Sequence, residues 1–112
     1  MNLPPLISSQ RYLNPETVQR KAATFKQFIV STATVELVGV RYRVLLDGHH
    51  NFAAAKLAGV EPTWRGPSPK MQRFIKRSTK DDLARFFINN LTDSDWYFMD
   101  TGQVVSELLA RA

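Results

Sequence analysis

The stretch 42–58 constrains the fold of this chain most, because two opposite secondary-structure patterns meet in it. Residues 42–46 are bulky and apolar, which predicts a buried strand. Asp47-Gly48 breaks that strand, and residues 52–58 predict a helix. A tight turn from strand to helix leaves the first helical amides without intrahelical partners. Those amides and the helix dipole favour a bound anion.

Two adjacent histidines, His49 and His50, follow this turn. Because imidazoles exchange protons near neutral pH, this is the place in the sequence where we expect chemistry. Neighbouring side chains of a regular strand or helix do not converge on one metal ion, so the pair does not predict a zinc site. We expect one imidazole to face the pocket and the other to pack or to meet solvent.

The chain has 112 residues, of which 44% are hydrophobic, and this predicts one domain over 1–112 with a real core. It contains no cysteine, which excludes disulfides, thiolate metal ligands and cysteine-based catalysis. The N-terminus lacks a signal-peptide pattern, and no apolar run approaches the roughly 18 residues of a membrane span. We therefore expect a soluble, cytoplasmic protein without a membrane partner.

The residues before the turn predict an α+β domain with a short mixed sheet flanked by helices. A capping asparagine, a proline and an acid at 14–16 start a helix, and apolar residues follow at helical spacing as far as Ile29. We expect Lys21 on that helix to face solvent. Residues 34–38 and 41–46 predict a hairpin whose two-residue primed turn is Gly39-Val40.

The C-terminal half predicts one more strand, a short apolar piece at 96–99 that is either a strand or a packed loop, and three helical pieces. The strand is expected at 60–64, and the helical pieces are an amphipathic turn or two at 71–75, a helix capped by Ser78 or Thr79, and a last helix capped by Thr101. The apolar residues expected to face inward on the last two helices are Leu83, Phe86, Phe87, Leu91, Val104, Val105, Leu108 and Leu109.

Basic residues gather between Arg65 and Arg85, against only two acids, in a chain of net charge +5. A clustered basic face can attract nucleic acid or another polyanion. The alternative is a solvated helix face. The residues expected to hold nucleic acid are Lys70, Arg73, Lys76 and Arg77.

Residues 47–60 read Asp-Gly-His-His-Asn-Phe-Ala-Ala-Ala-Lys-Leu-Ala-Gly-Val and are followed by Pro62. This pattern resembles the signature of the ParB/sulfiredoxin superfamily, and its Asp-Gly-His-His form is similar to that of the free serine kinases and of many proteins labelled ParB-like nuclease. The hairpin and the N-terminal helix also occur in the order that this family uses. The resemblance covers about 6–64 and implies a ParB/sulfiredoxin-like fold, with the basic segment and the C-terminal helix at 65–112 outside it.

The resemblance implies a nucleoside triphosphate with magnesium at the N-terminus of the helix. Gly48 matches the glycine that lets backbone amides approach the phosphates, and His50 matches the histidine of the sulfiredoxin-type motif. Asp47 matches an acid that holds magnesium or orients a hydroxyl. Asp47 and His50 are thus the candidate catalytic residues, with His50 as proton carrier or phosphate donor. The residues expected to bind the nucleotide are Gly48, His49, His50, Asn51 and Lys56, the last adding charge near the same mouth.

Three departures from the family pattern favour binding over turnover. Asn51 stands where the family has an arginine, so the bidentate cation is missing. The absence of cysteine excludes sulfiredoxin chemistry, and segment 65–112 is too short to add the helix-turn-helix domain of the chromosome-partition proteins. Slow nucleotide hydrolysis, phosphotransfer or nuclease activity are the enzymatic alternatives.

An alternative from another class is a non-catalytic adaptor that kept the fold and uses segment 65–85 to hold DNA, RNA or an acidic protein. Single residues also have plainer interpretations: Asp47 as a helix cap, the alanine run as tight packing, and Trp64 and Trp96 as core or rim residues. The sequence does not decide whether an exposed strand edge pairs two copies into a homodimer.

Overall fold

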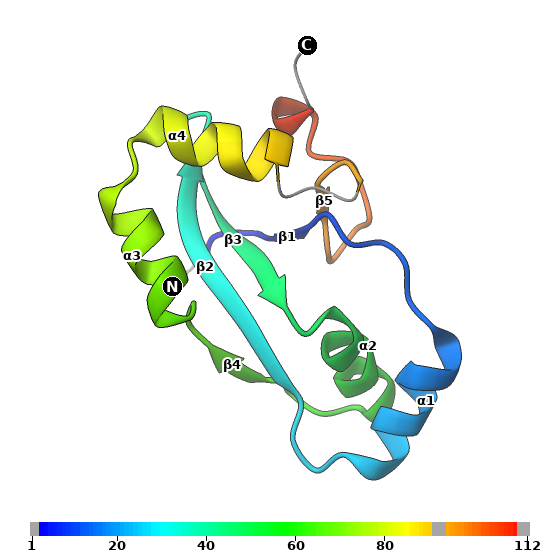
Figure 1. The fold of residues 1–112 in the computed structure, drawn as a ribbon. Coiled ribbons are helices and arrows are strands. Elements are labelled where there is room, and N and C mark those ends of the chain that lie inside the picture. Colours follow the sequence, from blue (N-terminus) through cyan, green and yellow to red (C-terminus); the bar gives the residue numbers. More distant parts are fainter. Residues whose placement is uncertain (1–2, 91–93, 110–112) are drawn as a thin grey trace.

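The computed structural model describes residues 3–90 and 94–109, and a five-stranded mixed sheet organises them (Figure 1). The sheet order is β4-β2-β3-β1-β5. β2 and β3 form a long antiparallel hairpin. On one side of it β4 pairs with β2 in parallel, and on the other side β1 pairs with β3 in parallel. β5 pairs with β1 in the antiparallel direction and ends the sheet. The bounds are β1 Leu6–Ser8, β2 Ile29–Leu37, β3 Val40–Asp47, β4 Thr63–Arg65 and β5 Tyr97–Phe98.

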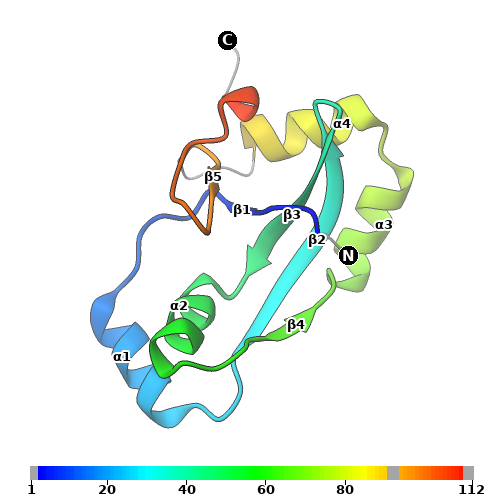
Figure 2. The same cartoon turned by 180° about the vertical axis from the view of Figure 1, so that it is seen from behind.

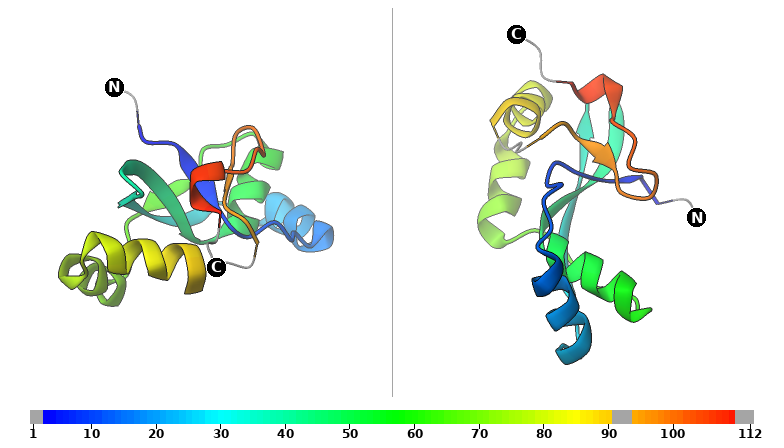
Figure 3. Two further views of the ribbon diagram at one scale, coloured as in Figure 1. Left: turned by 90° about the horizontal axis from the view of Figure 1, so that it is seen from above. Right: turned by 90° about the vertical axis from the view of Figure 1, so that its right-hand side faces the viewer.

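Helices flank this sheet, so the prediction of an α+β domain with a short mixed sheet is confirmed. α1 and α2 lie side by side at the end of the hairpin away from the β2–β3 turn (Figures 1 and 2), whereas α3 and α4 lie together on one side of the sheet (Figure 3). The bounds are α1 Pro15–Thr24, α2 His49–Ala58, α3 Pro69–Arg77 and α4 Lys80–Arg85, with a π-helical turn Phe86–Asn90 and a 3-10 turn Ser106–Leu108.

The main core lies between one face of the hairpin and the helical C-terminal half. Buried residues of β2 and β3, such as Val35 and Val44, meet Phe87 and Trp96 there. The Trp96 side chain is buried, and its indole N–H donates to the Phe87 carbonyl at 2.8 Å. Trp96 is therefore a core residue, and its one polar atom is satisfied inside the core.

A smaller core joins α1, α2 and the start of β2. Ala54 and Ala55 are fully buried against Phe28, and Val18 and Ala22 of α1 pack onto them. The alanine run thus brings α2 close to its neighbours, as its packing interpretation predicts. Because α1 contributes no fully buried residue of its own, its position depends on this small cluster and on its polar contacts with α2.

The hairpin turn is of the primed kind, as predicted, but it lies one residue earlier. Val38 and Gly39 both have positive φ, at 52° and 77°, and Leu37 pairs with Val40. A one-residue slip in register would move every side chain of a strand to the opposite face. Since Leu37 is fully buried in the observed register, burial fixes the turn even though a β-branched valine must adopt a left-handed conformation.

Two helix boundaries differ from the prediction. The first helix ends at Thr24 rather than reaching Ile29, which begins β2. The central helix begins at His49, three residues earlier than expected, so both histidines are helical. The strand after α2, β4, pairs with β2, so α2 carries the chain from β3 across to the other strand of the hairpin.

The expected last helix is wrong. Thr101 caps only a turn, accepting from the Gln103 amide at 3.2 Å, and Val104 forms an isolated bridge to Tyr97. A 3-10 turn, Ser106–Leu108, is all the helix that the described part of this segment contains. Val105 and Leu108 are buried as expected, whereas Val104 and Leu109 are exposed; Leu91 lies outside the described residues.

Candidate functional site

The turn into α2 has room only for a glycine. Gly48 has φ of 92°, and a Cβ added there would lie 2.6 Å from the Ile29 carbonyl oxygen of β2. This close approach presses the start of α2 against the neighbouring strand, so any side chain at this position would displace one or the other.

The start of α2 leaves three amides without a protein acceptor in the described part of the chain. Gly48 is the N-cap and no side chain caps the helix, which excludes the interpretation of Asp47 as a cap. The first intrahelical bond runs from the Phe52 amide to the Gly48 carbonyl at 2.8 Å. The amides of His49, His50 and Asn51 therefore precede the bonded turns and carry the positive end of the helix dipole.

A polar pocket of about 520 Å³ surrounds this helix start. We call it the histidine pocket. Its lining brings together all the candidate residues from 47 to 51 and adds others from α1, β2 and the segment before α1: Gln10, Lys21, Ile29, Ser31, Asp47, Gly48, His49, His50 and Asn51.

Both histidines of the pocket are tied to the segment that leads into α1. The His50 Nε2 accepts the Asn14 amide at 3.0 Å, and the His49 Nε2 lies 2.8 Å from the Tyr12 carbonyl oxygen. Their rings are 4.4 Å apart. We expected one imidazole to face the pocket and the other to pack or to meet solvent, but both line the pocket, and both contact the backbone of the segment before α1.

The bond to Asn14 keeps His50 neutral. An imidazole nitrogen that accepts a backbone N–H has no proton, so the ring proton of His50 belongs on Nδ1. Burial lowers the pKa of His50 below its ordinary value, and the nearby His49 and Lys21 lower it further. Near neutral pH, His50 therefore adds no positive charge to the pocket, and its Nε2 is not free to carry a proton.

Lys21 brings a cation into the histidine pocket. Its Nζ donates to the Asn51 Oδ1 at 2.7 Å, while the Asn51 Nδ2 donates to the Ile29 carbonyl at 2.9 Å. The expectation that Lys21 faces solvent is wrong, because α1 packs on α2 and turns this side chain into the pocket. The sequence shows Lys21 only as one more cation of the predicted helix, because the packing of α1 on α2 that brings it into the pocket is a contact between distant segments.

Asp47 ends β3 at the rim of the pocket. Its side chain is exposed and has no hydrogen bond or ion pair with the described residues. Nor do these residues include any group of three or more side chains suited to hold a metal ion. Magnesium commonly binds through one or two protein carboxylates together with phosphate oxygens, so the donor set fits the ion only when a phosphate is also present.

Lys56 does not reach the histidine pocket. It lies seven residues beyond His49 on α2, about 10 Å along the helix axis. It lines a different cavity, together with Arg43 and Trp64, and a smaller one of about 180 Å³ that it shares with His49. The prediction that Lys56 adds charge near the mouth is therefore wrong.

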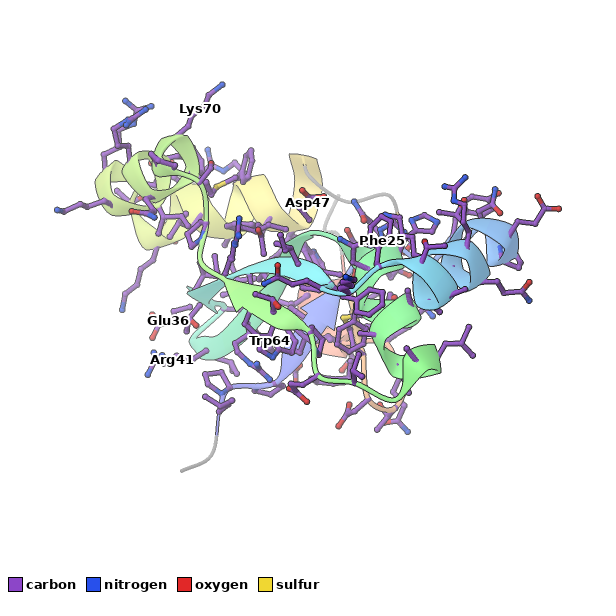
Figure 4. All side chains as sticks on the ribbon, turned by 90° about the horizontal axis from the view of Figure 1, so that it is seen from below. Phe25, Glu36, Arg41, Asp47, Trp64 and Lys70 are labelled. Atoms are coloured by element: carbon purple, nitrogen blue, oxygen red, sulfur yellow. The ribbon has the colours of Figure 1, made fainter. Side chains whose placement is uncertain are left out.

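The basic residues of α3 form an exposed face. Met71, Phe74 and Ile75 pack against the main core, and the other side of the helix carries Lys70, Arg73, Lys76 and Arg77. Figure 4 shows Lys70 pointing away from the rest of the molecule. Among the described residues the one ion pair joins Lys80 to Glu36 at 2.7 Å, so the four cations of the α3 face have no acidic partner there.

Comparisons with known proteins do not extend this description. None of the family models, curated proteins or solved structures compared with the chain matches it. In the described ranges no helix has both the length and the apolar character needed to cross a bilayer.

Proposed function

We propose that the protein binds the phosphate groups of a nucleotide at the start of α2, in a ParB/sulfiredoxin-like domain, and that it does so without turning the nucleotide over. The observation that carries this proposal is that the Lys21 ammonium and three amides with no acceptor among residues 3–90 and 94–109 meet in one polar pocket. Backbone N–H groups, a helix dipole and a cation all favour the same kind of guest, which is an oxyanion.

The positions of the polar groups support phosphate over a neutral ligand. Lys21 is held by Asn51, so its charge is positioned before the ligand arrives, and less entropy is lost on binding. Each charge-assisted hydrogen bond to a phosphate oxygen contributes about 1.5–3 kcal/mol. With Asp47 at the rim, a magnesium ion bound to the phosphates would have one protein carboxylate to hold it.

The same contacts argue against catalysis. A proton carrier needs a free ring nitrogen with a pKa near the working pH, and the His50 Nε2 is bonded to Asn14. A lysine point charge also cannot replace the bidentate clamp of an arginine on a transferring phosphoryl group. His50 and Lys21 are therefore better suited to binding a phosphate than to catalysing its transfer.

Lys21→Gln tests the proposal most sharply, because it removes the positioned charge and keeps a hydrogen-bonding side chain. Thermal unfolding is followed with and without magnesium and each common nucleoside triphosphate. A ligand at a concentration of about 100 times its Kd stabilises the native state by about 2.7 kcal/mol, which raises the Tm of a chain of this size by roughly 10 °C. We expect one of the nucleotides to raise the Tm of the wild type. In Lys21→Gln the same nucleotide should raise the Tm by no more than half as much.

The matched control is Arg20→Gln, the neighbouring cation of α1, which is exposed and does not line the pocket. It should keep the full nucleotide effect. If no nucleotide shifts the Tm of the wild type, or if both variants respond alike, the phosphate assignment is wrong.

A second candidate function, DNA or RNA binding, is favoured by the α3 face with its four exposed cations and no acidic partner among the described residues. Such binding would weaken steeply with salt, with a slope of about −0.9 per phosphate contact on duplex DNA. In a fluorescence anisotropy titration with a labelled duplex, reversing Arg73, Lys76 and Arg77 to glutamate should abolish binding. Lys21→Gln should leave it unchanged; equal loss in both variants would point to a general charge effect instead.

A further inference from the structure

A second cavity of about 520 Å³ lies beyond the histidine pocket and shares no lining residue with it. We call it the aromatic pocket. It forms where α2 and the strand β4 approach the segment before β1 and the turn that follows β5. None of the functions argued above makes use of it.

Two aromatic rings make a corner of this pocket. The centroids of Phe52 and Trp64 are 6.0 Å apart and their planes meet at 57°, so one ring forms a wall and the other a floor. Trp64 is 38% exposed, and its indole N–H is bonded to the Glu61 carboxylate at 3.1 Å. A large, oriented and partly uncovered aromatic surface of this kind suits a flat apolar ligand.

Arg43 and Lys56 add positive charge at the same corner. The Arg43 Nε donates to the Pro4 carbonyl at 2.8 Å, and its guanidinium carbon lies 5.6 Å from the centre of the Trp64 ring. These contacts hold the group in place and leave its terminal nitrogens without a partner in the described part of the chain. Lys56 is exposed and equally unpartnered there.

Two carboxylates, those of Glu61 and Asp100, also line the aromatic pocket. The Glu61 carboxylate is engaged by the Trp64 indole, whereas Asp100 is exposed at the end of β5. Because the indole N–H carries no charge, Glu61 keeps its full negative charge, and the two cations face two carboxylates. With these charges balanced, the preference for an anionic ligand rests on the Arg43 guanidinium, whose two terminal nitrogens have no partner among the described residues and fit a carboxylate.

We propose that the aromatic pocket binds a small aromatic carboxylate, with its ring against Phe52 and Trp64 and its carboxylate on Arg43 and Lys56. This proposal is independent of phosphate binding at the histidine pocket. The cavity places an apolar aromatic wall beside a cation. A bare phosphate would leave the aromatic wall without a contact, and a simple sugar would leave the cation without an anionic partner.

The two tryptophans allow a test inside a single molecule. Naphthalene-2-carboxylate is titrated into the ¹⁵N-labelled protein, and the two indole N–H signals are followed by NMR. The signal of Trp64 should move saturably, while that of the buried Trp96, which is bonded to Phe87, should stay in place. The neutral carboxamide and the cationic naphthylmethylammonium should each bind at least tenfold more weakly. Equal binding of all three, no movement of the Trp64 signal, or a movement that does not saturate would overturn the proposal.

Two substitutions then locate the carboxylate. Arg43→Gln should weaken binding of naphthalene-2-carboxylate at least tenfold, and Arg41→Gln is the matched control, since it is exposed on the same strand and does not line the pocket. Because Arg43 also holds Pro4, Lys56→Gln provides a variant without any such bond and should weaken binding several-fold. An unchanged Trp96 signal shows that each variant is folded. Binding that survives both Arg43→Gln and Lys56→Gln would contradict the assigned role of these cations.

Discussion

At the scale of single residues, His50 joins the candidate site to the rest of the molecule. Its Nε2 accepts a hydrogen bond from the amide of Asn14, which is the N-cap of α1. The imidazole of His50 therefore lines the histidine pocket and also holds the start of the neighbouring helix. This bond requires the neutral imidazole. The protonation state of one residue therefore couples the pocket to the attachment of α1.

His50 should accordingly make stability depend on pH. Its pKa is lowered in the folded protein, so the unfolded chain binds more protons just below the ordinary value of about 6.5. The stabilisation is fully present above that value and is lost as the pH falls through the window between the unfolded and folded pKa. Urea unfolding at pH 7.5 and at pH 5 should show a larger free energy of unfolding at the higher pH.

The His50→Asn variant should lose this part of the pH dependence. His49→Asn should keep most of it, because burial is the largest cause of the His50 shift and the His49 charge only the second. A His50→Asn variant whose free energy of unfolding falls as much as that of the wild type between the two pH values would show that another group is responsible.

At the scale of elements, the site depends on α1 packing against α2. Lys21 reaches the pocket only from α1, whose N-cap Asn14 accepts from the amides of Glu16 and Thr17 at 3.0 and 3.2 Å. No residue of this helix is fully buried, so its cap and its bond to His50 matter more than they would in a core helix. Loosening α1 should therefore affect binding as well as stability.

Asn14→Ala should cost about 1 kcal/mol of stability, the usual effect of removing a cap, and should also weaken nucleotide binding at the histidine pocket. Thr79→Ala is the control, since Thr79 caps α4 through a capping box with Asp82, and neither residue lines that pocket. Both variants should lower the Tm by a similar amount, but only Asn14→Ala should reduce the further rise on adding nucleotide. An equal nucleotide effect in the two variants would show that α1 does not position Lys21.

At the scale of the whole molecule, local signals in the sequence predicted the architecture better than the site. The break at Gly48, the cap at Asn14 and the capping box at Thr79 are encoded by neighbouring residues, and the structure has all three. Apolar periodicity likewise indicated the hairpin and the buried side of α3.

The missed features depend on contacts between distant segments. Lys21 joins the pocket because Phe28 and the alanines of α2 draw α1 onto that helix, and a sequence pattern shows no such packing. The C-terminal apolar residues have helical spacing, yet Val104 pairs with Tyr97 next to a left-handed Gly102, so strand-like contacts prevail over local propensity. The hairpin turn lies at Val38-Gly39 rather than at the predicted Gly39-Val40 for a similar reason. The burial of Leu37 outweighs the preference for glycine in the first turn position.

The central claim is that the three amides at the start of α2 receive a phosphate, and ¹⁵N NMR of the backbone during a pyrophosphate titration tests it most directly. The account predicts saturable shifts for the amides of His49, His50 and Asn51, a smaller one for Phe52, whose amide is already bonded to Gly48, and a loss of affinity in Lys21→Gln. Amides at 49–51 that stay in place, while signals from α3 move instead, would contradict it.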